Sequence, residues 1–161
     1  MLLNDSGVYV LLIEVPPTAA GSVQVGRLGE HFLPAGPYLY VGSARRGLSK
    51  RIARHEARRK QTHWHVDAVT LRAGRIRSWV WPHRPGLECR LARAVVGRGL
   101  GQVWVGGCGS SDCSCASHLF RATVSAGRLQ RLLCAQATPY RDWRPGEGQS
   151  SHEPTKRRPR G

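Results

Sequence analysis

The run GVYVLLIEV, from Gly7 to Val15, constrains the fold of this chain most strongly. Apolar, β-branched and aromatic residues fill the run almost without interruption, which is typical of a strand that is buried on both faces. Pro16 and Pro17 end it, because proline lacks the amide hydrogen that a continuing strand needs. We therefore expect this strand to lie at the centre of a sheet.

Other segments have the composition of strands and are separated by turn residues. Residues 22–33 predict two short strands joined by a turn at residues 26–29, and we expect this hairpin to extend the same antiparallel sheet. Residues 63–71 are interpreted as a strand or a short extended segment. The remaining predicted strands cover residues 38–43, 76–83, 103–105 and 118–124.

Two segments have helical spacing. The first is predicted to begin at Ser49, a residue type that caps helices, and to reach about Lys60. Its outer side is expected to carry cations and a histidine into solvent, namely Arg51, His55, Arg58 and Arg59. The second covers residues 86–99 and ends at two glycines. The fold class is therefore α+β, with a small antiparallel sheet flanked by helices.

The composition changes after Ala137 to Pro, Gly, Ser, Glu and Arg, with almost no aliphatic side chains. Such a segment has too little apolar surface to offset the entropy that is lost on ordering. We therefore expect one domain at residues 1–138, followed by a basic disordered tail at residues 139–161.

The chain is strongly basic, with 25 Lys and Arg against 10 Asp and Glu and a formal net charge of +15. Most of these cations precede Tyr140, so the charge belongs to the folded part as well as to the tail. The excess makes a polyanion the expected partner, with DNA first and RNA as the alternative.

The amino-terminal run does not have the pattern of a signal peptide or a membrane span. Asp5 and Glu14 flank it, and no basic segment precedes it, so no membrane partner is expected. The five cysteines, an odd number, then indicate reduced thiols or metal ligands in place of disulfides. We expect a cytoplasmic protein, associated with the nucleoid if the source is bacterial.

Two short motifs, Gly7-Val8-Tyr9 and Tyr40-Val41-Gly42, place tyrosines and glycines in two predicted strands. If the strands are neighbours, both phenols can point to one end of the sheet, and a phosphate can approach the backbone at Gly42 because no Cβ intervenes. Arg51 and His55 follow on the next helix. The alternative is a packed pair of tyrosines beside a solvated basic helix.

The pieces GVY, YVG, SARRGLSKRIARH and LECRLA resemble the GIY-YIG nuclease superfamily over about residues 7–124. The interval between Tyr9 and Tyr40 is longer than in most members, because it contains the extra segment at residues 22–36. Together with THWHVD and GSSDCSCASHLF, this segment resembles the Uri-type branch. The resemblance implies a small antiparallel sheet flanked by helices, with an extra hairpin between the two motif strands.

The resemblance also implies catalytic roles. Tyr9 would orient or deprotonate the attacking water, Tyr40 would assist it, and Arg51 would stabilise the transition state as a bidentate donor. Glu88 would hold one divalent cation, Mg²⁺ or Mn²⁺. Without the resemblance, Glu88 would be interpreted as a capping acid, whose charge is favourable near the start of a helix. Arg51 and this cation are expected to lower the pKa of Tyr9.

Exposed cations near the second motif are expected to contact nucleic acid, because they bind backbone phosphates whatever the base sequence. The predicted contacts are Gly42, Ser43, Arg45, Arg46, Lys50, Arg54 and Arg58. A histidine near the scissile phosphate is also implied, and His65 is favoured over His63, with His55 as a third candidate.

His63, His65 and Asp67 alternate, so an extended segment would point all three toward a transition metal. Exposed histidines without a metal are the alternative, and the one that the spacing favours.

The segment SSDCSCASHLF is a second candidate metal site. Cys113, Cys115 and His118, joined by either Cys89 or Cys108, have the ligand types of a tetrahedral Zn²⁺ site. The alternative is a tight turn with small buried thiols, in which Ser111 or Asp112 caps backbone amides.

These observations favour a metal-dependent phosphodiesterase, a DNA endonuclease of low sequence specificity. The alternative is a nucleic-acid-binding module that is catalytically weak or inactive and stabilised by zinc. Many GIY-YIG nucleases carry an asparagine late in the domain, whereas Asn4 is the only asparagine of this chain, so Ser117 or His118 would have to replace it.

Overall fold

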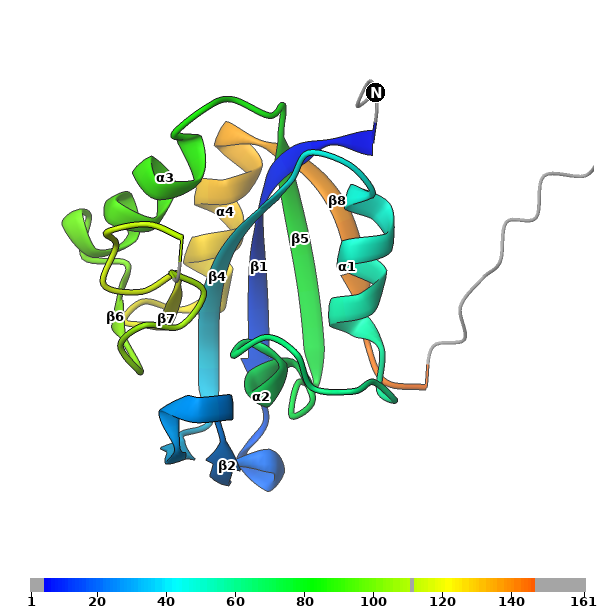
Figure 1. The fold of residues 1–161 in the computed structure, drawn as a ribbon, viewed down its shortest axis with the longest axis vertical. Coiled ribbons are helices and arrows are strands. Elements are labelled where there is room, and N and C mark those ends of the chain that lie inside the picture. The colour runs from blue at the N-terminus through cyan, green and yellow to red at the C-terminus, as the bar shows by residue number, and fades with distance from the viewer. Residues whose placement is uncertain (1–4, 111, 147–161) are drawn as a thin grey trace, which may run out of the picture.

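The computed structural model describes residues 5–110 and 112–146. Within them, a six-stranded antiparallel sheet forms the centre of the molecule, in the order β6-β7-β4-β1-β5-β8 (Figure 1). Its strands are β1 (Gly7–Val15), β4 (Gly36–Ala44), β5 (Arg75–Trp81), β6 (Gly101–Val103), β7 (Leu119–Ala122) and β8 (Thr138–Trp143). The prediction that residues 7–15 form a central buried strand is confirmed.

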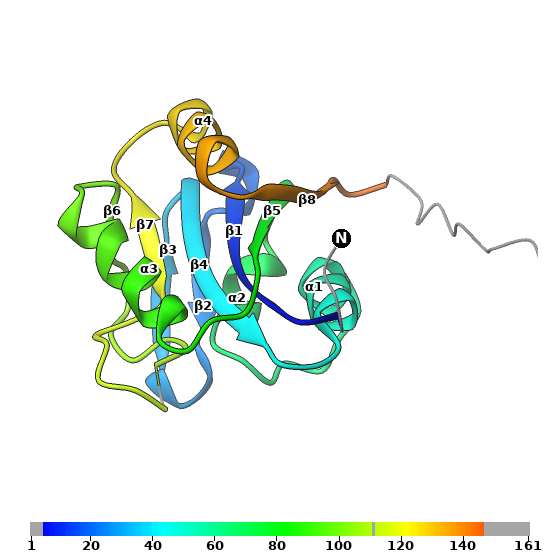
Figure 2. The ribbon, with the colours of Figure 1, turned by 90° about the horizontal axis from the view of Figure 1, so that it is seen from above.

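Alternation along β1 divides the apolar core between the two faces of the sheet. Tyr9, Leu11 and Ile13 point to one face, and Val8 and Val10 point to the other. Helices α1 (Leu48–Glu56) and α2 (Asp67–Thr70) cover the first face. Helices α3 (Leu87–Gly97) and α4 (Ala126–Gln136) cover the second. Figure 2 shows α1 and α2 on one side of the sheet and α4 on the other, so the α+β prediction is confirmed.

The extra hairpin between the motif strands is present. It consists of β2 (Gly21–Gln24) and β3 (Glu30–Leu33), with a short 3-10 turn at Gly26–Leu28 between them, and a second such turn at Pro17–Ala19 precedes it. The expectation that it extends the main sheet is wrong, because it forms a sheet of its own. Both edges of β1 and of β4 are already paired with other strands of the main sheet.

Helix α1 has other ends than predicted. It begins at Leu48 after Gly47, which has a left-handed backbone (φ 67°), while Ser49 binds the Asp5 carboxylate through its amide and its hydroxyl. It ends at Glu56, because Lys60 turns back and donates to the carbonyls of the last helical turn.

The segment at residues 63–71 is not extended. The carboxylate of Asp67 accepts the backbone amides of His63 and Trp64, which closes a turn and starts α2. Helix α4 was not predicted, although Ser125 caps its first turn through a hydrogen bond from the Arg128 amide.

The predicted tail begins too early. Residues 138–143 form β8, which pairs with the free edge of β5 and is held by two ion pairs, Arg75 with Asp142 at 2.7 Å and Arg141 with Glu56 at 2.9 Å. These backbone and charge interactions replace the aliphatic contacts that the segment lacks. Residues 147–161 of the predicted tail lie outside the described residues. Among the described helices, none is both long and apolar enough to cross a lipid bilayer.

Candidate active site

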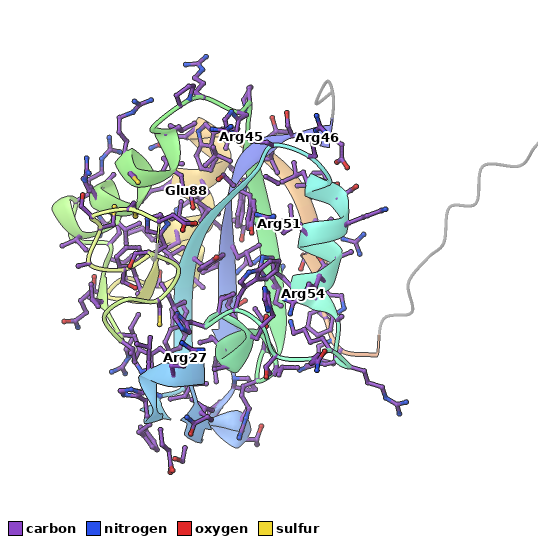
Figure 3. The ribbon with its side chains drawn as sticks, viewed as in Figure 1. Arg27, Arg45, Arg46, Arg51, Arg54 and Glu88 are labelled. Carbon is purple, nitrogen blue, oxygen red and sulfur yellow. The ribbon has the colours of Figure 1, made fainter. Side chains whose placement is uncertain are left out.

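Tyr9, Tyr40 and Arg51, three of the predicted catalytic residues, line one pocket of about 200 Å³ together with Glu88, the predicted metal ligand. They come from β1, β4, α1 and α3, respectively. Figure 3 shows Arg51 on the α1 side of β4 and Glu88 on the α3 side. The rest of the lining consists of Gly42, Ser43, Trp64, Gly109 and Asp112.

The register of β1 and β4 brings the two motifs together. Tyr9 lies opposite Gly42, and Leu11 lies opposite Tyr40. A Cβ atom at Gly42 would lie 2.5 Å from the phenol oxygen of Tyr9. The glycine therefore makes room for the Tyr9 ring at the place of its missing Cβ, and it also lines the pocket, so the approach of a phosphate to its backbone stays a prediction.

Arg51 is half-buried and points from α1 toward the end of β4. Its Nη1 donates to the carbonyl oxygen of Ser43 at 2.5 Å, and its guanidinium lies 5.3 Å from the centre of the Trp64 ring. These two contacts fix the direction of the side chain at the pocket wall.

Glu88 lies in the first turn of α3 and is held from two sides. Ser43 Oγ donates to Oε2 at 2.5 Å, and His118 Nδ1 lies 3.1 Å from Oε1. Burial alone would raise the pKa of Glu88, but these hydrogen bonds lower it below its usual value, so the group is a carboxylate. A carboxylate has about four acceptor sites, so capacity for a cation remains.

His55 lies in the core and not on the outer side of α1. Its exposure is 1%, because its spacing from Leu48 and Ile52 places it on the apolar face of the helix. Its Nε2 is 2.7 Å from the Tyr9 hydroxyl, and its Nδ1 has no hydrogen-bond partner among the described residues. Burial, helped by the nearby cation of Lys60, lowers the pKa of His55 to about 3, so the ring is neutral.

Both tyrosines of the pocket are protonated at neutral pH. Burial raises the pKa of Tyr9 well above its usual value, and it raises the pKa of Tyr40 in the same way. Arg51 acts in the opposite direction on both phenols, but its effect is smaller than that of burial. Arg51 thus acts on the pKa of Tyr9 in the expected direction but does not outweigh burial, and the expectation that Arg51 and a divalent cation together lower this pKa stays a prediction.

Two of the predicted nucleic-acid contacts are used inside the protein. Arg54 donates to both oxygens of Asp67, at 3.0 and 2.9 Å, and lies 4.2 Å from the Trp64 ring centre. Arg58 donates to the carbonyls of Leu71 and Ala73. Arg54 thereby braces the segment that carries Trp64 into the pocket, whereas Arg58, which is exposed, holds the residues that follow α2.

The histidines of THWHVD do not form a metal triad. The carboxylate of Asp67 is fully buried and accepts bonds from Arg54 and from the amides of His63 and Trp64. The His65 ring lies against Gly26 in the turn of the hairpin and does not line the pocket. The preference for His65 as a catalytic residue is therefore wrong.

Three predicted contacts remain exposed beside the pocket. Arg45 and Arg46 lie in the turn between β4 and α1, and Lys50 lies in the first turn of α1. Figure 3 shows both arginines at the outer end of this turn. They present positive charge next to Ser43, which lines the pocket.

A metal-ligating cluster lies behind Glu88. It consists of Cys89, Cys113, Cys115 and His118, whose ligand atoms all lie within 4.8 Å of one another. The Nε2 of His118 is 3.4 Å from the Sγ of Cys113. Cys108 is buried in the core beside Val105 and does not join. The four side chains can bind a metal ion, which favours this interpretation over a turn with small buried thiols.

Two pocket residues were not predicted as such. Gly109 has a left-handed backbone (φ 69°), and a Cβ there would lie 3.1 Å from the Tyr40 ring. Asp112 brings a second carboxylate to the lining, where the sequence suggested only a backbone cap. The available signal was their position in the same cysteine-rich loop, where Asp112 directly precedes Cys113. Ser117, a candidate for the missing asparagine, bonds to backbone groups of Cys108 and Leu119.

A family model described as "Domain of unknown function DUF123" matches residues 8–137. The chain belongs to this family. The matched part of the DUF123 domain includes all the pocket residues and the metal-ligating cluster, and it ends just before β8. Comparisons with curated proteins and with solved structures gave no match. The family description names no activity, so the function of this DUF123 domain has to be argued from its site.

Proposed function

We propose that this DUF123 domain is a metal-dependent phosphodiesterase of the GIY-YIG type, a DNA endonuclease of low sequence specificity. The convergence of Tyr9, Tyr40, Arg51 and Glu88 on one pocket carries the proposal. These residues are far apart in the sequence, and a chance set of core tyrosines and surface ions would not be expected to share one cavity.

The donors of the pocket suit a hard divalent cation. Glu88 and Asp112 supply carboxylates, the ligands that Mg²⁺ and Mn²⁺ prefer. When bound at Glu88, such a cation would act as a Lewis acid on the phosphate oxygens. A single resident carboxylate with a second one nearby fits Mg²⁺, which keeps most of its waters.

Arg51 and the tyrosines would share the remaining work. Arg51 would donate to the equatorial oxygens of the phosphate, where negative charge develops. Tyr9 stays protonated and is hydrogen-bonded to neutral His55, which supports orientation of the attacking water over its deprotonation by a resting tyrosinate. His55 would thus hold the phenol in place, and Tyr40 would border the same water.

We also propose Zn²⁺ as the ion of the cluster formed by Cys89, Cys113, Cys115 and His118. Three thiolates and one imidazole are the donor set of closed, tetrahedral structural zinc sites. Magnesium and calcium prefer oxygen ligands and would not select this set. Two metals of different chemistry would therefore lie on either side of Glu88.

DNA is the proposed substrate, with RNA as the alternative. Arg45, Arg46 and Lys50 would bind backbone phosphates without reading bases, which implies low sequence specificity. Trp64 lines the pocket between two arginines and offers a ring on which an unpaired base can stack. A DNA substrate agrees with the expected cytoplasmic location.

The test is a cleavage assay on labelled duplex, single-stranded and branched DNA, and on single-stranded RNA, with Mg²⁺ or Mn²⁺. We expect cleavage by the parent chain, and a loss of at least about 100-fold for Glu88→Ala and for Arg51→Ala. Glu30→Ala and Arg131→Ala are matched controls, because both residues are exposed and lie outside the pocket. Cleavage that survives both site changes would refute the assignment.

A catalytically weak nucleic-acid-binding module is the second candidate. The buried, protonated state of Tyr9 favours it, because a phenol with a raised pKa is a poor base. Binding to DNA in a gel-shift assay without cleavage of any of these substrates would support this candidate over the first.

A further inference from the structure

We propose that the metal ion of the Cys89, Cys113, Cys115 and His118 cluster fixes Glu88 through His118, and thereby sets the affinity of the pocket for its divalent cation. The inference rests on the proposed function, in that Glu88 is taken as the ligand of that cation. It makes His118 a positioning residue and the cluster a part of the active site.

The cluster joins two segments that both contribute to the lining of the pocket. Cys89 lies in α3, next to Glu88, whereas the other three ligands lie between β6 and β7. The same loop contributes Gly109 and Asp112 to the lining. An ion bound here would hold this wall of the pocket against the start of α3.

The distances fit a tetrahedral ion. Zinc bonds of about 2.3 Å to sulfur and about 2.0 Å to nitrogen place the two ligand atoms about 3.5 Å apart. The Sγ of Cys113 and the Nε2 of His118 are 3.4 Å apart, and the whole set lies within 4.8 Å. The thiols are free, and no disulfide is present among the described cysteines.

His118 is the link between the two sites. Its Nε2 faces the cluster, and its Nδ1 lies 3.1 Å from Oε1 of Glu88. A histidine that binds a metal through one nitrogen carries its hydrogen on the other and donates it to an outer carboxylate. With an exposure of 2%, the ring is shielded from water that would compete for this bond.

Glu88 is then held at both oxygens. Ser43 donates to Oε2 from β4, and His118 donates to Oε1 from the metal-bound loop. The carboxylate loses little freedom when a cation binds, because it is already oriented. Without the ion, the backbone of His118 stays bonded to Cys108 and Val41, but nothing at Nε2 fixes the tautomer and direction of the imidazole, so its hold on Oε1 of Glu88 weakens.

Two matched substitutions distinguish the effect of the hydrogen bond between His118 and Glu88 from the effect of the bound ion. His118→Cys keeps four zinc ligands, all of them thiolates, but removes the imidazole N–H that reaches Glu88. Cys115→His also keeps four ligands, two thiolates and two imidazoles, and leaves His118 and its contact with Glu88 in place. Circular dichroism spectra establish that each variant is folded.

The measurement is Zn²⁺ content by elemental analysis together with Mn²⁺ affinity by electron paramagnetic resonance, without DNA. We expect one Zn²⁺ per chain in the parent and in both variants. Mn²⁺ affinity should fall by about 10- to 100-fold in His118→Cys, and by no more than about twofold in Cys115→His, which changes a zinc ligand but keeps the bond from His118 to Glu88. Glu88→Gln should abolish the tight Mn²⁺ site in each background.

A parent chain without Zn²⁺ or without a Mn²⁺ site at Glu88, or a folded His118→Cys chain with parental Mn²⁺ affinity, would overturn the inference. If His118→Cys fails to fold, a second measurement replaces Zn²⁺ with Co²⁺ in chains that keep His118. The d–d absorption band of the parent should shift in Glu88→Gln and stay in place in Glu30→Gln. A band that does not shift in Glu88→Gln refutes the link. Since none of these measurements uses cleavage, a chain that passes them yet cuts no DNA or RNA refutes only the phosphodiesterase.

Discussion

At the scale of single residues, the contact between Tyr9 and Gly42 decides the shape of the pocket. The glycine is required by the position of the phenol ring, which fills the space where a Cβ would lie. The resemblance to a motif identified both residues, but the reason for the glycine became clear only from the register of β1 and β4.

Gly42→Ala should therefore displace the Tyr9 ring and weaken both folding and activity. We expect the free energy of unfolding in urea to fall by about 1–3 kcal/mol, as for other overpacked cores. Gly97→Ala is the matched control, because nothing lies within 4 Å of a Cβ at this helical position. It should be neutral or slightly stabilising, and equal losses in the two variants would contradict the account.

His55 should make the stability of the fold depend on pH. Its folded-state pKa of about 3 lies below the ordinary value of about 6.5, so the unfolded state binds a proton first. The contribution of neutral His55 is present above pH 6.5 and is lost as the pH falls toward 3.

The free energy of unfolding of the parent chain, measured by urea titration between pH 7 and 4, should therefore decrease toward acid. His55→Gln should remove most of this slope, although the variant is less stable at pH 7. His63→Gln, at an exposed position, should retain the slope. A slope unchanged by His55→Gln would show that another group is responsible.

At the scale of elements, β1 and α3 were predicted well, whereas α2, α4 and β8 were missed. Strand β1 was predicted from its apolar run and the prolines that follow it. Helix α3 was predicted from its helical spacing and its terminal glycines. Helix α2 has four residues and depends on hydrogen bonds to Asp67, which no periodicity reveals. Strand β8 depends on the free edge of β5, a partner distant in the sequence.

Asp67 should be the main support of the segment that carries Trp64. It is fully buried, with Arg54 at 2.9 Å, Lys60 at 3.7 Å and two backbone amides as partners. Burial alone would raise the pKa of Asp67, but these bonds hold it at about 2. Removal of the charge leaves buried cations without a counterion.

We expect Asp67→Asn to lower the free energy of unfolding by about 3–5 kcal/mol in urea titrations. Asp142→Asn breaks the exposed pair with Arg75 and should cost less than about 1 kcal/mol. Similar losses for the two changes would mean that Asp67 does not have this supporting role.

Strand β8 should contribute to the folded domain although its side chains are largely exposed. The test compares a chain that ends at Gly146 with a chain that ends at Ala137. The shorter chain lacks β8 and therefore Arg141, the ion-pair partner of buried Glu56. The shorter chain should be less stable by about 2–5 kcal/mol, from several backbone hydrogen bonds and one ion pair. Identical thermal unfolding of the two chains would show β8 to be dispensable.

At the scale of the whole molecule, two sites share the carboxylate of Glu88. The pocket lies between α1 and α3 at the end of β4, and the cysteine cluster lies on the far side of Glu88. The sequence allowed either Cys89 or Cys108 as the fourth cluster ligand. Only the fold could decide, because it places Cys89 at the start of α3 and Cys108 in the core.

Tyr9, Tyr40, Arg51 and Glu88 were predicted through the resemblance to the GIY-YIG motifs, because their spacing alone fits a packed pair of tyrosines beside a solvated basic helix equally well. Tyr9, Tyr40 and Arg51 belong to one strand pair and the helix that follows it, and Glu88 begins a helix with clear periodicity. The histidines were not predictable in the same way. Whether His55 or His65 contacts a pocket residue depends on the packing of α1 and of the hairpin.

The central claim is that Arg51 and Glu88 act on one phosphate from opposite sides of β4. The most direct measurement is a double-mutant cycle of single-turnover DNA cleavage in Mg²⁺, with Arg51→Ala, Glu88→Ala and the combined variant. If the two residues form one active site, each single change costs at least about 100-fold, and the combined loss is far smaller than their product. Losses that multiply would contradict a shared site, and single variants as active as the parent would refute the proposed phosphodiesterase.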